Sequence, residues 1–467
     1  MRQRWTTLFL AATVMMMGYV FWDVVSPLST TLKSPVHDGG MAWTAAEYGF
    51  FAGSYSIFNI FLLMLFFGGI ILDRMGIRFT GIMATGMMLA GAFVNYAAIA
   101  FMSPEQYIDM PFTLFGLIPA HLKLQVLVSA IGFGIFGVGC DITGITISKV
   151  VTKWFTGHEL ASAMGIQVAM ARLGTASAIS FSPLLAFYYG LPAPLLAGVI
   201  VLLLGFVLFI VYTWMDRSFD RHEEQRQIAV TEAKQQPSEV HATEQTSFLS
   251  PLRKVLRNPG FWLIAVLCVF FYSSIRPFLK FATDVLVNKY GIEEVTAGWI
   301  VSILPYGTII LTPLFGNLYD RVGRGATLML IGCIIVTLCH ILIAMPIMNT
   351  TWMASIIMIF LGISFSLVPS AMWPSVPKIV PLGQLGTAYS IIYFIQNIGL
   401  MLVPMWVGNI IGENTDTDGQ VNFTPPMLIF TAFGIASAIT AWILRWMDKR
   451  KNYGLEKANE QLKTGAD

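Results

Sequence analysis

Charged residues are scarce in this sequence: only 12% of its 467 residues are Asp, Glu, Lys or Arg, while 56% are hydrophobic. A soluble domain carries about 25% charged residues, so this composition argues against one. The four cysteines lack metal-ligand spacing and the six histidines do not cluster, so we expect no metal site. The sequence has no phosphate-binding Walker loop and no group of Ser, His or metal-ligand residues that could carry catalysis, so it does not indicate an enzyme. We therefore expect no cofactor and no catalytic residues.

What the sequence has instead is long apolar runs. A run of about 20 such residues can cross a hydrocarbon core of about 30 Å as a helix. Twelve runs lie near residues 6–26, 45–72, 79–102, 124–148, 159–182, 191–214, 260–282, 296–318, 326–346, 352–375, 384–411 and 425–446. They are too long for the strands of a membrane barrel, which alternate over about ten residues. The sequence therefore predicts an all-α integral membrane protein with twelve transmembrane helices in two six-helix bundles.

Basic residues predict the orientation, because Lys and Arg accumulate on the side of a membrane that is not translocated. With a cytoplasmic N-terminus, only Lys33, Lys123, Lys280 and Lys289 of the 28 Lys and Arg residues fall in segments on the other side. The first run lacks a cleavage site, so we expect it to be retained. Both termini are predicted to be cytoplasmic. The net charge of +2 reflects this topology, and we expect no nucleic-acid partner.

The twelve runs form two sets of six. The stretch between them, residues 216–258, is charged and poor in aromatic residues, which is typical of a partly helical linker. We predict an N-terminal six-helix bundle over residues 1–215, a cytoplasmic linker over 216–258, a C-terminal six-helix bundle over 259–447 and a cytoplasmic tail over 448–467.

A short motif follows the second run of each set. Residues 69–78 (GIILDRMGIR) return 247 residues later as residues 316–324 (GNLYDRVGR). Glycine lets helices approach closely, the acid suits a helix N-terminus, and arginine can reach a carboxylate. We interpret the two copies as cytoplasmic latches that favour an outward-open state when closed, and not as ordinary turns, because repeated halves are typical of secondary transporters. The predicted gating residues are Gly69, Asp73, Arg74, Gly76, Arg78, Gly316, Asp320, Arg321, Gly323 and Arg324.

These features together resemble the major facilitator superfamily over essentially the whole chain. Narrower stretches resemble its lysosomal dipeptide transporter family: residues 154–160 (WFTGHEL), 171–174 (ARLG), 371–374 (AMWP), 380–389 (VPLGQLGTAY) and 396–400 (QNIGL). The resemblance implies movement of dipeptides down their gradient, hence a uniporter. Because no sorting sequence precedes the first run, we expect the cytoplasmic membrane of a bacterium. Because a bacterial member can work alone, we do not expect an accessory subunit.

Two opposite charges are predicted at mid-membrane, where an uncompensated charge costs several kcal/mol. At about 1.5 Å per residue, Asp141 lies roughly 18 Å from Lys153 and Arg172 roughly 21 Å from His158, so their depths are similar. A guanidinium can bind a carboxylate bidentately and an acid can bind an ammonium group. We predict that Arg172 holds the C-terminus of a peptide and Asp141 its N-terminus. The alternative is a permanent Asp141–Arg172 ion pair that touches no substrate.

Six further residues complete the predicted binding site: Asp23, Arg276, Tyr55, Trp373, Gln396 and Asn397. Asp23 lines the cavity or takes up a proton, or is simply solvated near the interface. Arg276 marks a gating bend beside Pro277, or reaches the membrane surface. The aromatic and amide side chains line the cavity, or bond to neighbouring helices.

We therefore predict a secondary transporter of small zwitterions, above all dipeptides, embedded in the lipid bilayer. The alternative is a proton-coupled or exchange carrier of small organic anions, which Arg172 and Arg276 would hold while Asp141 stays structural.

One apparent motif in the sequence is not interpreted as a binding site. Residues 132–137 (GFGIFG) match a dinucleotide-binding pattern, but they lie inside an apolar run that follows no strand, so we expect a close-packing helix face.

Overall fold

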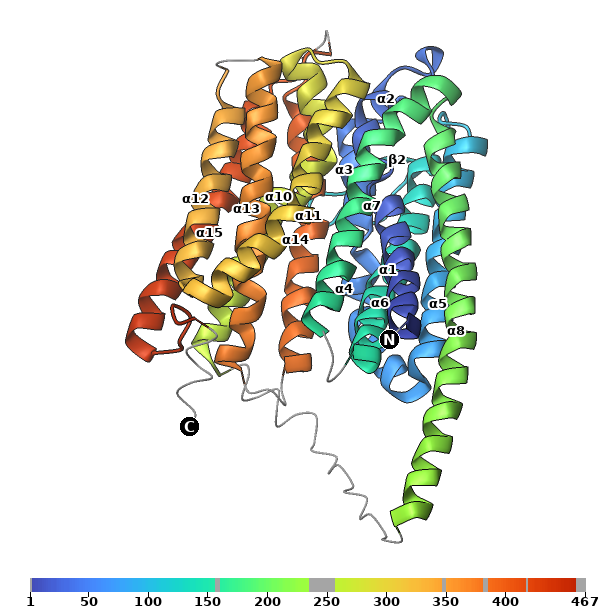
Figure 1. Cartoon of the computed structure of the whole chain (residues 1–467). Helices are drawn as coiled ribbons and strands as arrows, with labels where there is room; N and C mark the ends of the chain where they lie inside the picture. Colours follow the sequence, from blue (N-terminus) through green and yellow to red (C-terminus); the bar gives the residue numbers. More distant parts are fainter. Residues whose placement is uncertain are drawn as a thin grey trace.

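The protein is almost entirely helical in the computed structural model, which describes residues 2–155, 160–234, 257–346, 350–380, 385–416 and 419–458 (Figure 1). The first bundle contains α1 (Arg2–Asp23), η1 (Ser26–Leu28), α2 (Ser29–Lys33), η2 (Val36–Asp38), α3 (Ala45–Ser54), α4 (Ile57–Phe61), α5 (Met64–Phe101), the strands β1 (Tyr107–Asp109) and β2 (His121–Lys123), α6 (Leu124–Phe155), α7 (Leu160–Tyr189) and α8 (Pro192–Lys234). The second contains α10 (Pro259–Tyr290), α11 (Glu294–Val322), α12 (Gly325–Ala344), α13 (Thr351–Ile379), α14 (Leu385–Glu413) and α15 (Thr424–Lys451).

Eleven helices among the described residues are long and apolar enough to cross a membrane. The second predicted span is the one missing from this number, because it is broken into α3, α4 and the start of α5. Its breaks fall at Tyr55 and at Leu63, whose φ of 51° is left-handed. With this span counted in pieces, the predicted all-α fold of two six-helix bundles is confirmed.

The second glycine of the repeated motif has a positive φ in both copies. Gly76 has a φ of 80° within α5, where it kinks the chain between the second and third spans. Gly323 has a φ of 71° at the end of α11. Positive φ is readily adopted only by glycine, so the second glycine of each motif copy is required by the turn that it makes. The two copies of the motif thus share a glycine with positive φ at the same position.

Close helix packing explains the glycine-rich run in α6. A Cβ atom added at Gly137 would lie 2.1 Å from the Tyr55 carbonyl oxygen, and one added at Gly132 would lie 2.7 Å from the backbone nitrogen of Asn95. Residues 132–137 therefore form the close-packing face that the sequence predicted. This packing brings the break at Tyr55 directly against α6.

The molecule has two distinct ends, and pairs of helices join its two bundles. We call the end where α1 begins and α15 ends the terminal face (lower in Figure 1), and the end that carries α2 and the start of α11 the distal face. Between the bundles, α3 packs on α14 and α7 packs on α11. Gly49 and Gly408 make the first contact possible, since a Cβ atom at Gly49 would lie 2.9 Å from the Gly408 Cα atom. Residues 216–234 of the predicted linker continue α8, and residues 235–256 lie outside the described chain.

Candidate functional site

Asp141 lies on α6 and is held by two neutral donors from the broken second span. The Tyr55 hydroxyl donates to its Oδ1 atom at 2.7 Å, and the Asn59 amide donates to its Oδ2 atom at 2.7 Å. Both donors are buried, and the break at Tyr55 gives them their orientation toward α6. Within the described chain no cation forms an ion pair with Asp141. The carboxylate is thus oriented, yet its charge is not neutralised by a protein group.

Arg172 lies on α7 and reaches across to the second bundle. Its Cζ atom lies 4.4 Å from the ring centroid of Phe365 on α13. Among the described residues no carboxylate forms an ion pair with Arg172. The permanent Asp141–Arg172 pair, left open by the sequence, is therefore not formed in this structure.

Asp23 and Arg276 belong to a different cluster, centred on a lysine that the sequence analysis missed. Lys280 Nζ donates to Asp23 Oδ1 at 2.8 Å, to the Trp22 carbonyl at 2.8 Å and to Ser26 Oγ at 2.9 Å. Arg276 Nη1 lies 3.9 Å from the other Asp23 oxygen. All three charged residues are buried, so the alternatives of a solvated Asp23 and a surface-reaching Arg276 are wrong.

Lys280 was assigned to a segment beyond the membrane because the predicted seventh span ended near it. In the structure α10 continues to Tyr290, which places Lys280 well inside the helix. One signal was present in the sequence: Lys280 follows Arg276 by four residues, so both project from the same helix face. Two cations on one face inside a membrane call for an acid opposite them.

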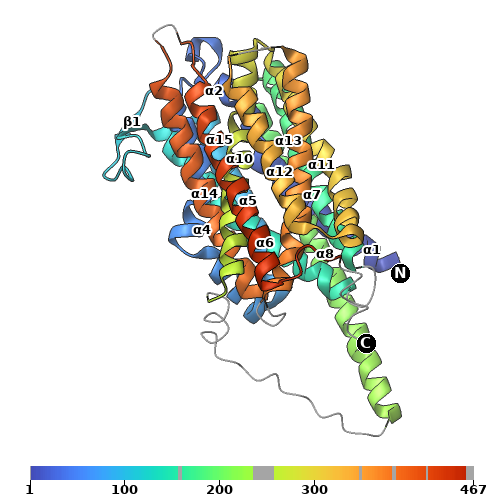
Figure 2. The same cartoon turned by 90° about the vertical axis from the view of Figure 1, so that its left-hand side faces the viewer.

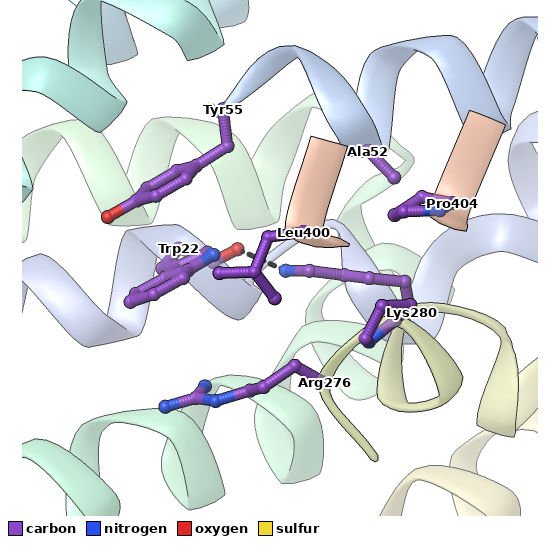
Figure 3. A pocket seen from close by; sticks show the side chains of 8 residues that line it. Trp22, Ala52, Tyr55, Arg276, Lys280, Leu400 and Pro404 are labelled. Carbon is purple, nitrogen blue, oxygen red and sulfur yellow. Dashed lines mark hydrogen bonds between the residues drawn. The ribbon is translucent and has the colours of Figure 1, made fainter. Parts of the chain in front are cut away.

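Aromatic rings connect the two charged clusters. The Trp22 ring stacks on Tyr55 with centroids 4.3 Å apart and an interplanar angle of 4°, and Arg276 Cζ lies 4.9 Å from the Trp22 centroid. These residues line a cavity between the bundles together with Ala52, Pro277, Lys280, Leu400 and Pro404. Figure 3 shows Trp22 between Tyr55 and Arg276, with the Lys280 ammonium pointing to the Trp22 carbonyl. Trp22 is a second residue that the sequence analysis missed.

The Phe365 ring lies beside both arginines on the cationic side of the site. Arg276 Cζ lies 5.5 Å from its ring centroid, so Arg172 and Arg276 border the same ring. An aromatic face attracts cations and places guanidinium groups without neutralising them. Only Arg276 of the two has a carboxylate near it in the described chain.

The remaining predicted binding residues make contacts within the protein. Asn397 accepts a hydrogen bond from Ser56 Oγ at 2.6 Å, which joins the two bundles. Trp373 Nε1 donates to the Tyr272 hydroxyl at 3.2 Å. Gln396 Oε1 lies 3.6 Å from Cys268 Sγ. These contacts support the alternative of bonding between helices, and a binding role for the three residues stays a prediction.

Polar contacts close the distal face. Thr30 and Lys33 on α2 both bond the Asp284 carboxylate on α10, at 3.2 and 2.5 Å. Thr31 Oγ1 donates to Glu294 on α11 at 2.6 Å. Because α2 belongs to the first bundle while α10 and α11 belong to the second, these bonds hold the bundles together at this end.

The motif residues at the terminal face have described contacts within their own bundle. Asp73 accepts from Lys149 at 2.6 Å, and Arg78 Nε donates to Asp216 at 2.8 Å. The Arg324 backbone N–H donates to the Glu456 carbonyl. A Cβ atom at Gly69 or at Gly316 would meet open space, so the predicted close helix approach is not made at these two glycines in this structure.

The other predicted gating residues lie at the same face. Arg74, Asp320 and Arg321 are exposed there. Residues 156–159 and 381–384, from the stretches that resemble the dipeptide transporter family, lie outside the described chain. The latch role of the motif stays a prediction.

Comparison with known proteins gives a consistent result. The family model "Major Facilitator Superfamily" matches residues 5–404 and again residues 278–465. The chain is 26% identical to the lysosomal dipeptide transporter MFSD1 of Bos taurus over 413 residues, which covers 85% of this chain and 78% of that protein. It is 20% identical to the hexuronate transporter of Bacillus subtilis over 415 residues, covering 87% and 88%. A solved bacterial homologue of the lysosomal transporter Spinster, inward-facing and occupied, superposes with a TM-score of 0.65 at 14% identity, covering 95% and 97%.

Proposed function

This chain belongs to the Major Facilitator Superfamily, and from that premise we propose that it moves dipeptides across the membrane by alternating access. It is a multi-pass membrane transporter whose relatives are transporters and not enzymes. The relatives named as dipeptide transporters support the choice of substrate. The proposed ligand is a zwitterion held at both ends.

The observation that carries this proposal is the contrast between paired and unpaired charges. Asp23 is bonded by Lys280 and lies near Arg276, whereas Asp141 and Arg172 have no ion-pair partner in the described chain. An unpaired charge inside a membrane protein is costly unless it serves a ligand. A zwitterion supplies one partner to each: its ammonium group to Asp141 and its carboxylate to Arg172.

Aromatic side chains lie between the two proposed anchors. Tyr55, which donates to Asp141, stacks on Trp22, and Arg276 lies beside Trp22. Arg276 and Arg172 both border the Phe365 ring. The body of the proposed ligand would therefore lie along these rings.

The proposed cycle follows from the distal contacts. Bonds between α2 and the second bundle close the distal face, so we infer that this structure represents the state in which the site opens toward the terminal face. Substrate release on the other side requires these bonds to break and the bundles to rock about the site. We place the terminal face in the cytoplasm because most Lys and Arg residues lie there. The bacterial cytoplasmic membrane stays the predicted location.

A second candidate function is transport of small organic anions. The hexuronate transporter is among the relatives, and Arg172 and Arg276 border the same Phe365 ring, where a carboxylate could bind between them. In this case Asp141 would not contact the ligand.

Uniport and proton-coupled transport differ in one requirement. Proton coupling needs a carboxyl group that changes protonation during the cycle, and Asp141 and Asp23 are the candidates.

Uptake into proteoliposomes separates these functions. We expect uptake of a radiolabelled dipeptide down its gradient, without any pH gradient, and competition by other dipeptides but not by hexuronates. Uptake of hexuronates with no uptake of dipeptides would contradict the proposal and favour the anion carrier. Dipeptide uptake that requires a pH gradient would retain the substrate and replace uniport by proton coupling.

A further inference from the structure

The segment between α5 and α6 forms a hairpin whose tip contains no charged residue. Strands β1 and β2 pair in antiparallel register, and the tip between them includes residues 110–120, MPFTLFGLIPA. Loops that face water are normally polar, with turn residues such as Asn, Asp and Ser. The tip instead exposes Phe112 by 61% and Phe115 by 99%. Such exposure of large aromatic side chains outside the bundle calls for an apolar environment.

The backbone fixes the outward direction of these rings. Leu114, Phe115 and Gly116 all have positive φ values, of 44°, 57° and 82°, which turns the chain sharply at the tip. Leu114 and Leu117 pack back against the core of the bundle. Phe115 lies between them in the sequence and is left on the outside.

A hydrogen bond gives the depth of the tip. The Asn409 side-chain amide on α14 donates to the Gly116 carbonyl at 3.0 Å and to the Leu117 carbonyl at 3.3 Å. Asn409 is four residues, or about 6 Å, from the distal end of α14 at Glu413. The tip therefore lies at the level of the last turns of a membrane-spanning helix. Figure 2 shows the hairpin extending sideways from the bundle near β1.

Charges and aromatic residues around the tip have the distribution of a membrane interface. Asp109 and His121 pair with each other at the base of the hairpin, both largely exposed. Trp406 on α14 is 45% exposed and precedes Asn409 by three residues, so it lies on the same face of that helix. Tryptophan and other aromatic side chains are enriched where the hydrocarbon core meets the headgroups.

We propose that the hairpin tip is an interfacial anchor, which inserts Phe112 and Phe115 into the lipid leaflet at the distal face. The partner is the bilayer itself, because the tip is uncharged, lies at the depth of a helix end and continues the lipid-facing surface marked by Trp406. The paired charges at the base remain among the headgroups.

A fluorescent label tests this placement. The four native cysteines are buried, so Phe115→Cys and Phe112→Cys can be labelled selectively with an environment-sensitive nitrobenzoxadiazole probe. The matched control is His37→Cys, in the exposed polar turn η2 at the same face. In proteoliposomes we expect lipids with a nitroxide near the headgroup to quench the labels at 112 and 115 at least twofold more than the label at 37. Aqueous iodide should quench in the opposite order.

Two results would overturn the proposal. Labels at 112 and 115 that iodide quenches as strongly as the label at 37 would place the tip in water. Labels protected from both quenchers would indicate a protein partner, such as a second copy of this chain. Melting temperatures of the labelled variants within a few degrees of the parent would show that the fold is intact in each case.

Discussion

Removal of the Lys280 ammonium group should open the distal face. Lys280 lies on α10 of the second bundle, and its Nζ atom donates three hydrogen bonds of 2.8–2.9 Å to Trp22, Asp23 and Ser26 of the first bundle. These bonds must break when the bundles separate at this end. The interaction therefore stabilises the distal-closed state relative to the distal-open state.

The size of the effect follows from the burial of the pair. The Lys280 side chain is 11% exposed and that of Asp23 is 2% exposed. Truncating one partner of such a buried charge pair costs about 2–5 kcal/mol. Since about 1.4 kcal/mol is tenfold, the ratio of distal-open to distal-closed molecules should rise between about 30-fold and a few thousand-fold in Lys280→Met.

Spin labels measure this ratio directly. We would place them at His37→Cys and Glu293→Cys, which are exposed at the distal face of the first and second bundle. Lys280→Met should increase the population at long label separations, as should Asp23→Asn. Lys449→Met, an exposed lysine at the terminal face, is the control and should leave the distribution unchanged. An unchanged distribution in both cluster variants, with melting temperatures that confirm folding, would refute the conclusion that the Lys280 bonds stabilise the distal-closed state.

Two glycines give further predictions that concern packing. Gly137→Ala places a Cβ atom 2.1 Å from the Tyr55 carbonyl oxygen and should lower the melting temperature by several degrees, since overpacking costs about 1–3 kcal/mol. A Cβ atom at Gly165 on α7 meets open space, so Gly165→Ala should be neutral or slightly stabilising. Equal melting temperatures for the two variants would contradict the close packing of Gly137 against Tyr55. Gly49→Ala separates α3 from α14 and should increase the distal-open population in the same spin-label experiment; a shift toward the closed state would contradict the contact with Gly408.

Much of the architecture could be predicted because it depends on local sequence. Hydrophobic runs long enough to span a membrane fix the helices, and the repeated motif fixes the relation of the two halves. The break in the second span could not be predicted, because the residues around Tyr55 contain no proline or charge that ends a helix. The structure shows the break, and it shows the Tyr55 carbonyl packed against Gly137 of α6.

The site was harder to predict than the fold. Asp141 and Arg172 stand out in the sequence because charges are rare inside apolar runs. Lys280 could not be recognised from the sequence as the partner of Asp23, because the two residues are 257 positions apart. Which helices of the two bundles lie side by side is a property of the tertiary structure. Trp22 has no sequence signal at all, since one more aromatic residue in an apolar helix is ordinary.

The most direct test of the account combines changes in the ligand with changes in the protein. Binding of dialanine, N-acetyl-dialanine and dialanine amide is measured by calorimetry for the parent, Asp141→Asn and Arg172→Gln, with Asp38→Asn as an exposed control. A charge-assisted hydrogen bond contributes about 1.5–3 kcal/mol, so each single change should weaken binding by at least tenfold.

The decisive quantity is the coupling between the two kinds of change. If Asp141 binds the ammonium group, N-acetylation should weaken binding to the parent and to Arg172→Gln but have little further effect on binding to Asp141→Asn. If Arg172 binds the carboxylate, amidation should likewise weaken binding to the parent and to Asp141→Asn but have little further effect on binding to Arg172→Gln. Penalties that simply add in every combination would contradict the zwitterion clamp and leave Asp141 a structural residue.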